Sequence, residues 1–248
     1  MKFARKCGVA IFAAGLVLGL SACDRSDSPS KKIERAAEDA IGELKGEDLP
    51  PVPVGRFAPR DECLDQPGAS EFLGSLDSAV QARDEQAFLA LVADDVILDF
   101  GGGSGKALLR ERLKDDDLAL WDELNELMTL GCASDGARIT MPWYFAQDFP
   151  STPGAVAIVT GESVPLLEVP EDTTEPLAQI SWDMVEVSFE DTAQHENFAK
   201  VSWNDGKAGT RPYEGYIAKD RLRYLIDYRV IAARRNDRWS ITNFIAGD

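Results

Sequence analysis

The sequence predicts an α+β protein that combines helices and antiparallel strands with a small all-β barrel. Three observations favour this fold class. Apolar residues recur at helical spacing over 69–131, short strand-like segments separated by turns fill 161–219, and a hairpin pattern ends the chain at 228–244. The helices and the last hairpin would build one domain, and the short strands would build the other.

The chain begins with the pattern of a secretory leader, MKFARKCGVAIFAAGLVLGLSAC. Its start is basic, and the apolar run 9–20 is too short to span a bilayer comfortably. A cleaved signal over 1–22 is therefore favoured over a permanent transmembrane helix.

The end of this leader, Leu-Ser-Ala-Cys at 20–23, resembles the lipobox of bacterial lipoproteins. The resemblance implies cleavage before Cys23 and acylation of that residue, and two or three acyl chains hold a protein at a membrane far more firmly than one. Asp24 resembles an inner-membrane retention signal. These residues predict a protein anchored in the bacterial envelope, at the periplasmic face of the inner membrane. The alternative is an ordinary secretory signal that ends by chance in a cysteine.

Residues 23–62 have the pattern of a lipid-anchored tether. Residues 30–46 could form a short charged helix with a thin apolar stripe, and EDLPPVPVGRFAPR (47–60) is a proline-rich, semi-rigid spacer. The first folded domain would begin after this spacer.

The chain is strongly acidic, because 26 Lys and Arg residues face 43 Asp and Glu residues, a net charge of −17. Residues 1–22 hold three of the basic residues and no acid, so the remaining 23 against 43 leave −20. Such a surface repels nucleic acid, so we expect no DNA or RNA partner. Cations or basic partners are the alternative to a merely solvated acidic surface.

LDFGGGSGKALL (98–109) raises the question of a nucleotide-binding loop. A Walker A motif aligned on its Gly-Lys pair has Phe100 at the first glycine position and Ala107 at the hydroxyl position, and a dinucleotide fingerprint would need glycine where Lys106 stands. ATP and GTP are also scarce outside the cytoplasm. We therefore expect no nucleotide and no cofactor, and we interpret the glycines as a strand-to-helix turn.

The four cysteines have different expected fates. Cys7 leaves with the signal and Cys23 carries lipid, so Cys63 and Cys132 remain. Two cysteines in an oxidising compartment are expected to pair, closing a loop of roughly 70 residues. The alternative, a metal site with His195, lacks zinc-ligand spacing. We expect a disulfide, no metal, and a surface loop around the histidine.

Two segments resemble the first and last parts of nuclear transport factor 2-like (NTF2-like) domains, the superfamily of ketosteroid isomerase and SnoaL-like proteins. They are ARDEQAFLALVADDVILDFGGGSGKALLRERL (82–113) and RNDRWSITNF (235–244). The resemblance implies helices packed across a curved sheet to form an open cone. This domain would comprise 63–160 and 220–248.

FAKVSWNDGKAGTRPYEGYIAKDRLR (198–223) resembles the end of bacterial Src-homology-3-like (SH3-like) domains. The resemblance implies a small barrel over 161–219, either inserted into the NTF2-like domain or following it. Trp203, Tyr213 and Tyr216 could line an aromatic groove, and the alternative is that they belong to the core.

These features favour a non-catalytic binding or scaffold protein for cell-wall peptide (peptidoglycan) or an envelope protein. The alternative is a small-ligand-binding or isomerase-like enzyme that uses the cone pocket, which would need a carboxylate base opposite a hydrogen-bond donor. Asp99, Tyr144, Asp183 and Tyr228 are suitable residue types. No spacing connects them to a mechanism, so no catalytic residue is assigned.

Overall fold

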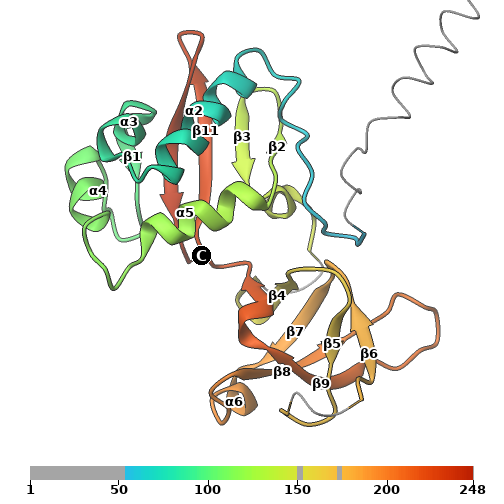
Figure 1. Ribbon diagram of the computed structural model, residues 1–248. Helices are drawn as coiled ribbons and strands as arrows, with labels where there is room; N and C mark the ends of the chain where they lie inside the picture. Colours follow the sequence, from blue (N-terminus) through green and yellow to red (C-terminus); the bar gives the residue numbers. More distant parts are fainter. Residues whose placement is uncertain (1–53, 150–152, 172–174, 248) are drawn as a thin grey trace, which may run out of the picture. The chain divides into compact units, whose positions relative to one another are not determined.

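The computed structural model describes residues 54–149, 153–171 and 175–247, all within one compact unit that spans 52–248 (Figure 1). The predictions for the signal, for Cys23 and Asp24 and for residues 23–53 of the tether lie outside the described residues. The rest of the predicted tether, 54–62, is not a free spacer: Phe57 and Ala58 are each 2% exposed, and Phe57 N–H donates to the Trp182 carbonyl at 2.7 Å. No helix of the described part is long and apolar enough to cross a membrane. The protein has a mixed α+β fold with two five-stranded sheets.

Four helices precede or cover the first sheet at the sites that the apolar periodicity predicted: α2 (Ala69–Gln81), α3 (Glu85–Ala90), α4 (Lys106–Arg112) and α5 (Leu120–Thr129). Asp84 caps α3 by accepting a hydrogen bond from the main-chain N–H of Ala87 at 3.0 Å. Helix α5 begins after the aspartates at 115–117 rather than at them. Ala119 has a φ of 46°, a left-handed conformation that separates the preceding turns from the helix.

The first sheet has the strand order β1-β12-β11-β3-β2, with β1 (Val92–Ile97), β2 (Ala133–Ser134), β3 (Arg138–Met141), β11 (Arg229–Arg235) and β12 (Arg238–Ile245). The predicted C-terminal hairpin is β11–β12, and it lies between β1 and β3. The prediction of a fully antiparallel sheet is wrong at one pair, because β1 runs parallel to β12. A parallel pair needs a long connection, which the chain between these strands supplies.

The space between the helices and the first sheet is filled by apolar side chains. The sheet contributes Val96, Ile139, Val230 and Ile241, and the helices contribute Leu76, Leu109, Leu124 and Leu127, each at most 1% exposed. In the sequence, Phe100 continues the apolar alternation of Val96 and Leu98, which are buried, but it is itself 59% exposed. Strand β1 ends at Ile97, so the alternation does not continue to residue 100.

The glycine-rich segment is the predicted strand-to-helix turn. Leu98 N–H donates to the Gly103 carbonyl at 2.9 Å, and Gly105 N–H donates to the Val96 carbonyl at 2.7 Å. The Asp99 carboxylate accepts from Gly103 N–H at 2.8 Å. A Cβ on Gly103 would overlap that carboxylate, so glycine is needed there for close approach.

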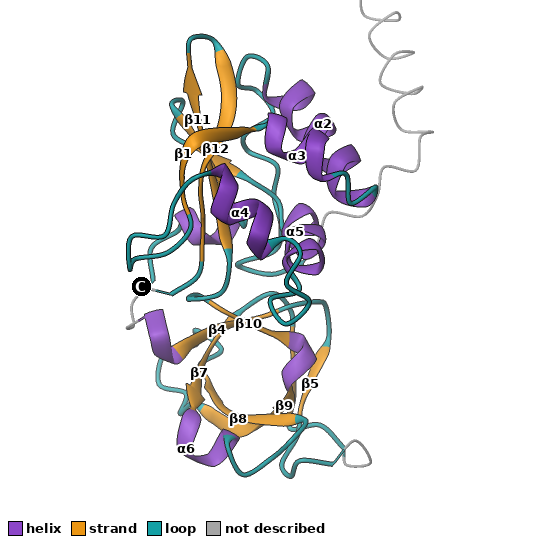
Figure 2. Ribbon diagram, turned by 90° about the vertical axis from the view of Figure 1, so that its left-hand side faces the viewer, coloured by secondary structure: helices purple, strands orange, loops and turns teal. Residues whose placement is uncertain are grey.

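The second sheet has the strand order β10-β4-β7-β8-β9 and is antiparallel throughout. Its strands are β4 (Val156–Val159), β7 (Met184–Ser188), β8 (Phe198–Trp203), β9 (Tyr213–Ala218) and β10 (Leu222–Tyr224). A separate hairpin, β5 (Val164–Leu166) with β6 (Ala178–Ile180), is linked to β9 by a bridge between Leu167 and Tyr216. Figure 2 shows these strands curving around a common interior, which Val185, Val201 and Ile217 help to fill.

The hydrogen-bonded strands of the second sheet do not close into a barrel within the described residues. The short strands lie where the turn pattern predicted them, but the SH3-like assignment stays a prediction. The short helix α6 (Phe189–Thr192) was not predicted, because its single turn lies inside a strand-rich block.

Strands β4 and β10 pair in the second sheet, although the sequence boundaries placed residues up to 160 and from 220 with the first domain. All four residues of β4 are buried, so the strand shows no polar face that could indicate its sheet. Ala157 and Val159 face the second core. Val156 and Ile158 face a third apolar cluster, with Phe57, Leu130, Trp143, Tyr144 and Leu225 among its other members.

The predicted disulfide is present between Cys63 and Cys132, whose Cα atoms lie 5.6 Å apart. Both cysteines are buried. The bridge ties the segment before α2 to the end of α5, and a hydrogen bond of 2.8 Å from Glu62 N–H to the Cys132 carbonyl reinforces this connection.

Candidate functional site: a polar groove and a buried arginine cluster

The structure does not bring the three aromatic candidates together on one face. Trp203 and Tyr213 are paired in register on β8 and β9, with ring centroids 5.6 Å apart, and both pack against the second core. Tyr216 lies three residues beyond Tyr213, so its side chain points to the other face of the sheet, where it pairs in register with Lys200 of β8. The ring of His195 lies edge-on to Tyr216 at 5.1 Å. Two of the aromatics are therefore core residues, and one lies on the outer face.

The two carboxylates considered for isomerase chemistry have structural partners. Asp99 forms an ion pair with Arg112, and the guanidinium hydrogen bond lowers the pKa of Asp99. Asp183 accepts from Trp203 Nε1 at 2.9 Å and from Met184 N–H at 2.8 Å. Each carboxylate therefore holds a turn or strand end in place.

The two tyrosines considered for isomerase chemistry lie in apolar surroundings. Tyr144, in the 3-10 helix η1 (Trp143–Ala146), is 1% exposed, and the Tyr228 ring packs on Phe244 at 4.9 Å between centroids. Burial raises the pKa of both phenols, so they stay neutral near pH 7. The structure does not gather the four candidates in one place: Asp183 lines a groove on the second sheet, whereas Tyr144 and Tyr228 lie beside Arg223.

A groove of about 870 Å³ lies over the outer face of β7 and β8. The β8–β9 loop, 204–210, lines one side of the groove, and Arg56 of the N-terminal segment also lines the groove. Its lining residues offer carboxylates, two hydroxyls, an amide, two cationic groups and glycine main chain. The lining side chains that carry this chemistry are Arg56, Asp183, Glu186, Ser202, Asn204, Asp205, Lys207 and Thr210.

A smaller hollow of about 290 Å³ continues along the same face and shares Glu186 and Ser202 with the groove. Its floor includes Ser188, whose Oγ donates to Asp191 Oδ2 at 2.8 Å, and Lys200 Nζ lies 3.3 Å from the same oxygen. The Ser188 hydroxyl hydrogen bond, followed by that from Lys200, lowers the pKa of Asp191. The outer face of the second sheet is thus polar and hollowed over three strands.

A second polar site is buried and centres on Arg223 of β10, whose side chain is only 4% exposed. Its Nη1 lies 2.9 Å from Glu126 Oε2, and its Nη2 donates to Glu123 Oε2 at 3.1 Å. Nη2 also donates to the Tyr228 carbonyl at 3.0 Å. Helix α5 of the first domain and β10 of the second sheet are therefore joined by a buried cation with two carboxylates.

Tyr144 and Asp227 complete the surroundings of this arginine. The Tyr144 hydroxyl and Arg223 Nε are buried and make no hydrogen bond of good geometry within the described residues. Asp227 Oδ2 accepts from Tyr224 N–H at 2.7 Å, and burial raises the pKa of this carboxyl, with Glu123 and Glu126 adding to the effect. Sequence reasoning missed this cluster, because nothing local connects residues 123 and 223.

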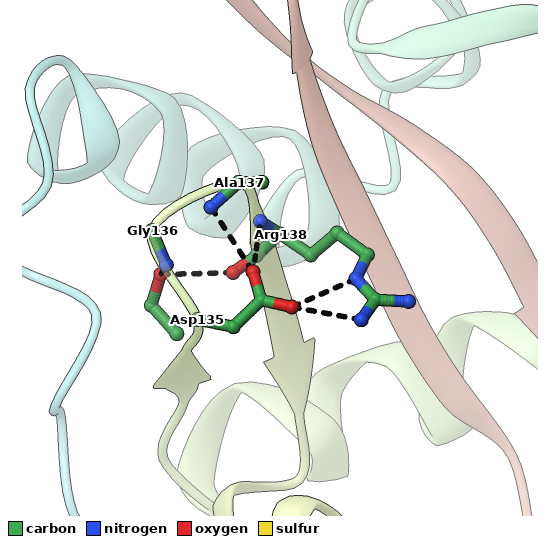
Figure 3. Close-up of polar contacts among 5 residues, drawn as sticks. Asp135, Gly136, Ala137 and Arg138 are labelled. Atoms are coloured by element: carbon green, nitrogen blue, oxygen red, sulfur yellow. Dashed lines mark hydrogen bonds and ion pairs between the residues drawn. The ribbon is translucent and has the colours of Figure 1, made fainter.

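The polar turn between β2 and β3 is self-contained. Asp135 accepts from Ala137 N–H at 3.0 Å and from Arg138 N–H at 2.8 Å, and the Arg138 guanidinium donates to it at 2.8 and 2.9 Å (Figure 3). The guanidinium lowers the pKa of Asp135. These contacts close the hairpin. No group of three or more possible metal ligands occurs among the residues that the structure describes.

Neither a protein-family model nor a curated protein sequence matches the chain. Solved structures with some similarity include a protein of unknown function with a cystatin-like fold from Nostoc punctiforme. The two sequences are 12% identical, the TM-score is 0.27, and the match covers 75% of this chain and 92% of the other. An NTF2-like protein of unknown function from Pseudomonas putida gives 12% identity, a TM-score of 0.22 and coverage of 72% and 82%. TM-scores this low do not establish a shared fold, so the NTF2-like assignment stays a prediction.

Proposed function

We propose that the protein is a lipid-anchored, non-catalytic binding module of the bacterial envelope, and that the groove over β7 and β8 is its ligand-binding surface. The filled interior between the helices and the first sheet carries this proposal. An isomerase-like enzyme would need an open pocket with a base at that place, and Leu109, Leu124 and Ile139 are fully buried there instead.

The chemistry of the groove supports a short peptide as its ligand. Peptides present amino, carboxylate and main-chain amide groups, and the groove offers the complementary Asp and Glu carboxylates, the cations of Arg56 and Lys207, and exposed main chain in the loop. The resemblance of 198–223 to SH3-like domains and the lipobox-like end of the leader support cell-wall peptide in particular. A peptide segment of another envelope protein would meet the same chemistry.

The anchor is tested by metabolic labelling of cells with a palmitate analogue. We expect label on the wild type and none on Cys23→Ser, which should also leave the membrane fraction. Cys7→Ser is the matched control, because Cys7 lies in the same leader and should be removed with it. Labelling of the Cys23→Ser protein would contradict the anchor.

The ligand is tested by co-sedimentation of the detergent-solubilised full chain with purified cell wall. Ser202→Tyr places a large ring in the groove and should abolish retention. Ser240→Tyr is the control, because Ser240 is a similarly half-buried strand serine in the first sheet. Retention that is equal in both variants would exclude the groove, and no retention of the wild type would exclude cell wall as the ligand.

A further inference from the structure

A hollow of about 410 Å³ adjoins the groove, because Arg56 lines both of them. Its other lining residues come from 57–62 and from 143–148, and they include a second arginine, Arg60. We call it the Arg56–Arg60 hollow. Two guanidinium groups therefore lie beside a groove that is itself lined by three carboxylates.

Each guanidinium of the hollow lies over an aromatic ring. Arg56 Cζ is 4.9 Å from the centroid of the Phe57 ring, and Arg60 Cζ is 4.6 Å from that of Trp143. Both rings are fixed by packing, since Phe57 is 2% and Trp143 4% exposed. A guanidinium held over a ring can keep its N–H edge free to donate two hydrogen bonds to one carboxylate. The rings thus orient both cations before a ligand binds.

The main chain that carries the two arginines is also held in place. Next to Arg56, Phe57 N–H donates to the Trp182 carbonyl at 2.7 Å. The Arg60 carbonyl accepts from the N–H of Cys132, a disulfide residue, at 2.8 Å. The two arginines are therefore positioned by contacts with different parts of the fold.

Two carboxylates, Glu62 and Asp148, line the same hollow and compete for the arginines. Glu62 Oε1 lies 3.7 Å from Arg60 Nη1, which is longer than a hydrogen bond, and both side chains are more than half exposed. An exposed pair at this distance stabilises the protein little, so a ligand carboxylate can replace Glu62. Asp148 is exposed to solvent.

We propose that the Arg56–Arg60 hollow is the subsite that binds the carboxylate end of the peptide, and that the rest of the peptide lies in the groove over β7 and β8. A carboxylate is a pure hydrogen-bond acceptor, which two guanidinium groups satisfy. The carboxylates of the groove repel such a group and attract the amino groups of a peptide. The subsite therefore determines the direction in which the ligand binds. This inference rests on the proposed function, because it assigns one end of the same ligand.

The test is isothermal titration calorimetry of the full chain in detergent with two probes, the peptide acetyl-Lys-Ala-Ala and its C-terminal amide. We expect the free carboxylate to bind about three- to tenfold more tightly than the amide, as suits half-exposed cations. The double variant Arg56→Gln/Arg60→Gln should lose this preference. Glu62→Gln should increase it, because this change removes the competing carboxylate.

Arg238→Gln is the control for the change in net charge, since Arg238 is an exposed arginine at the start of β12 in the first sheet. This variant should keep the preference of the wild type. The side chains of Arg56, Arg60 and Glu62 are exposed as well, so we expect all of these variants to fold.

Equal binding of the two peptides by the wild type would overturn the subsite, as would a preference that survives in the double arginine variant. Ser202→Tyr separates this inference from the proposed function. A preference for the carboxylate that persists at full affinity in Ser202→Tyr would support the subsite and refute the groove. Loss of both peptides in Ser202→Tyr, with equal binding in the wild type, would support the groove and refute the subsite. If the wild type binds neither peptide, the subsite is refuted, and co-sedimentation with cell wall decides the groove.

Discussion

The buried arginine and its carboxylates should not be equally costly to remove. We compare Arg223→Met with the double variant Glu123→Ala/Glu126→Ala. Both changes delete the same two ion pairs, which join α5 to β10. They differ in what they leave behind.

The solvent exposure of each side chain in these ion pairs determines how much each variant should lower the free energy of unfolding. The Arg223 side chain is 4% exposed, whereas those of Glu123 and Glu126 are 31% and 47% exposed. Removing the carboxylates leaves a buried cation with the Tyr228 carbonyl and the Asp227 carboxylate as its remaining partners. An uncompensated buried charge costs about 3–5 kcal/mol, and we expect the cost of the double variant to approach that range. Removing the arginine leaves carboxylates that water can reach, and methionine replaces the buried stem, so we expect a cost of about 1 kcal/mol.

Urea unfolding followed by far-UV circular dichroism measures both variants against the wild type, with a common m-value as the condition for comparing them. The exposed pair Arg235 and Asp95, with side chains 57% and 68% exposed, is the control. Arg235→Met and Asp95→Ala should each leave the urea midpoint of unfolding nearly unchanged, because water screens an exposed ion pair. If Arg223→Met costs as much as the double variant, the burial of the guanidinium does not determine the stability of the junction.

Three further predictions test other parts of the fold. Reduction of the Cys63–Cys132 bridge, which spans 69 residues, should lower the free energy of unfolding by about 4 kcal/mol in urea titrations, and a Cys63→Ala/Cys132→Ala variant should match the reduced wild type. Gly131→Ala should lower Tm, because Gly131 has a φ of +68° and a Cβ there would overlap nearby main chain. Gly136→Ala is the control: Gly136 has a φ of +88° but open space around it, so this variant should lower Tm only through backbone strain. The hydrogen bond from Arg112 lowers the pKa of Asp99, so the ionised carboxylate stabilises the fold at neutral pH, and this stabilisation is lost as the pH falls through the lowered pKa. Asp99→Asn should therefore lower Tm at neutral pH and have the same Tm as the wild type in strong acid, which thermal melts would measure.

The helices and most strands could be predicted because their signal is local. The stripe of α2, with Phe72 and Leu76 buried, and the alternation of β8 and β9 each arise within one element. The disulfide could also be predicted, because removal of Cys7 and acylation of Cys23 would leave two cysteines. These inferences need composition and periodicity, and no knowledge of which elements meet.

The sequence-based predictions fail where the position of a strand or side chain depends on a partner that is distant in the sequence. Val156 and Ile158 face one apolar cluster while Ala157 and Val159 face another, so an all-apolar strand could not reveal its sheet. Strand β1 runs parallel to β12, which lies about 140 residues later in the chain, so no local turn signal indicates this pairing or its direction. Phe100 follows the alternation of β1 but lies beyond its end.

The arginine cluster could not have been found from the sequence for a related reason. Arg223 occupies an inward position of a short strand, where alternation predicts an apolar residue, and its carboxylates lie 100 and 97 positions earlier among 43 acidic residues. Charge pairing has no period, so nothing distinguishes these two acids from the solvated ones. Burial of the cation makes them different, because an arginine this deep needs compensating charge and α5 presents two carboxylates to it. The arginine cluster is thus a property of the contact between α5 and β10. A variant of α5 that removes these carboxylates but leaves the helix intact should therefore still weaken the packing of β10.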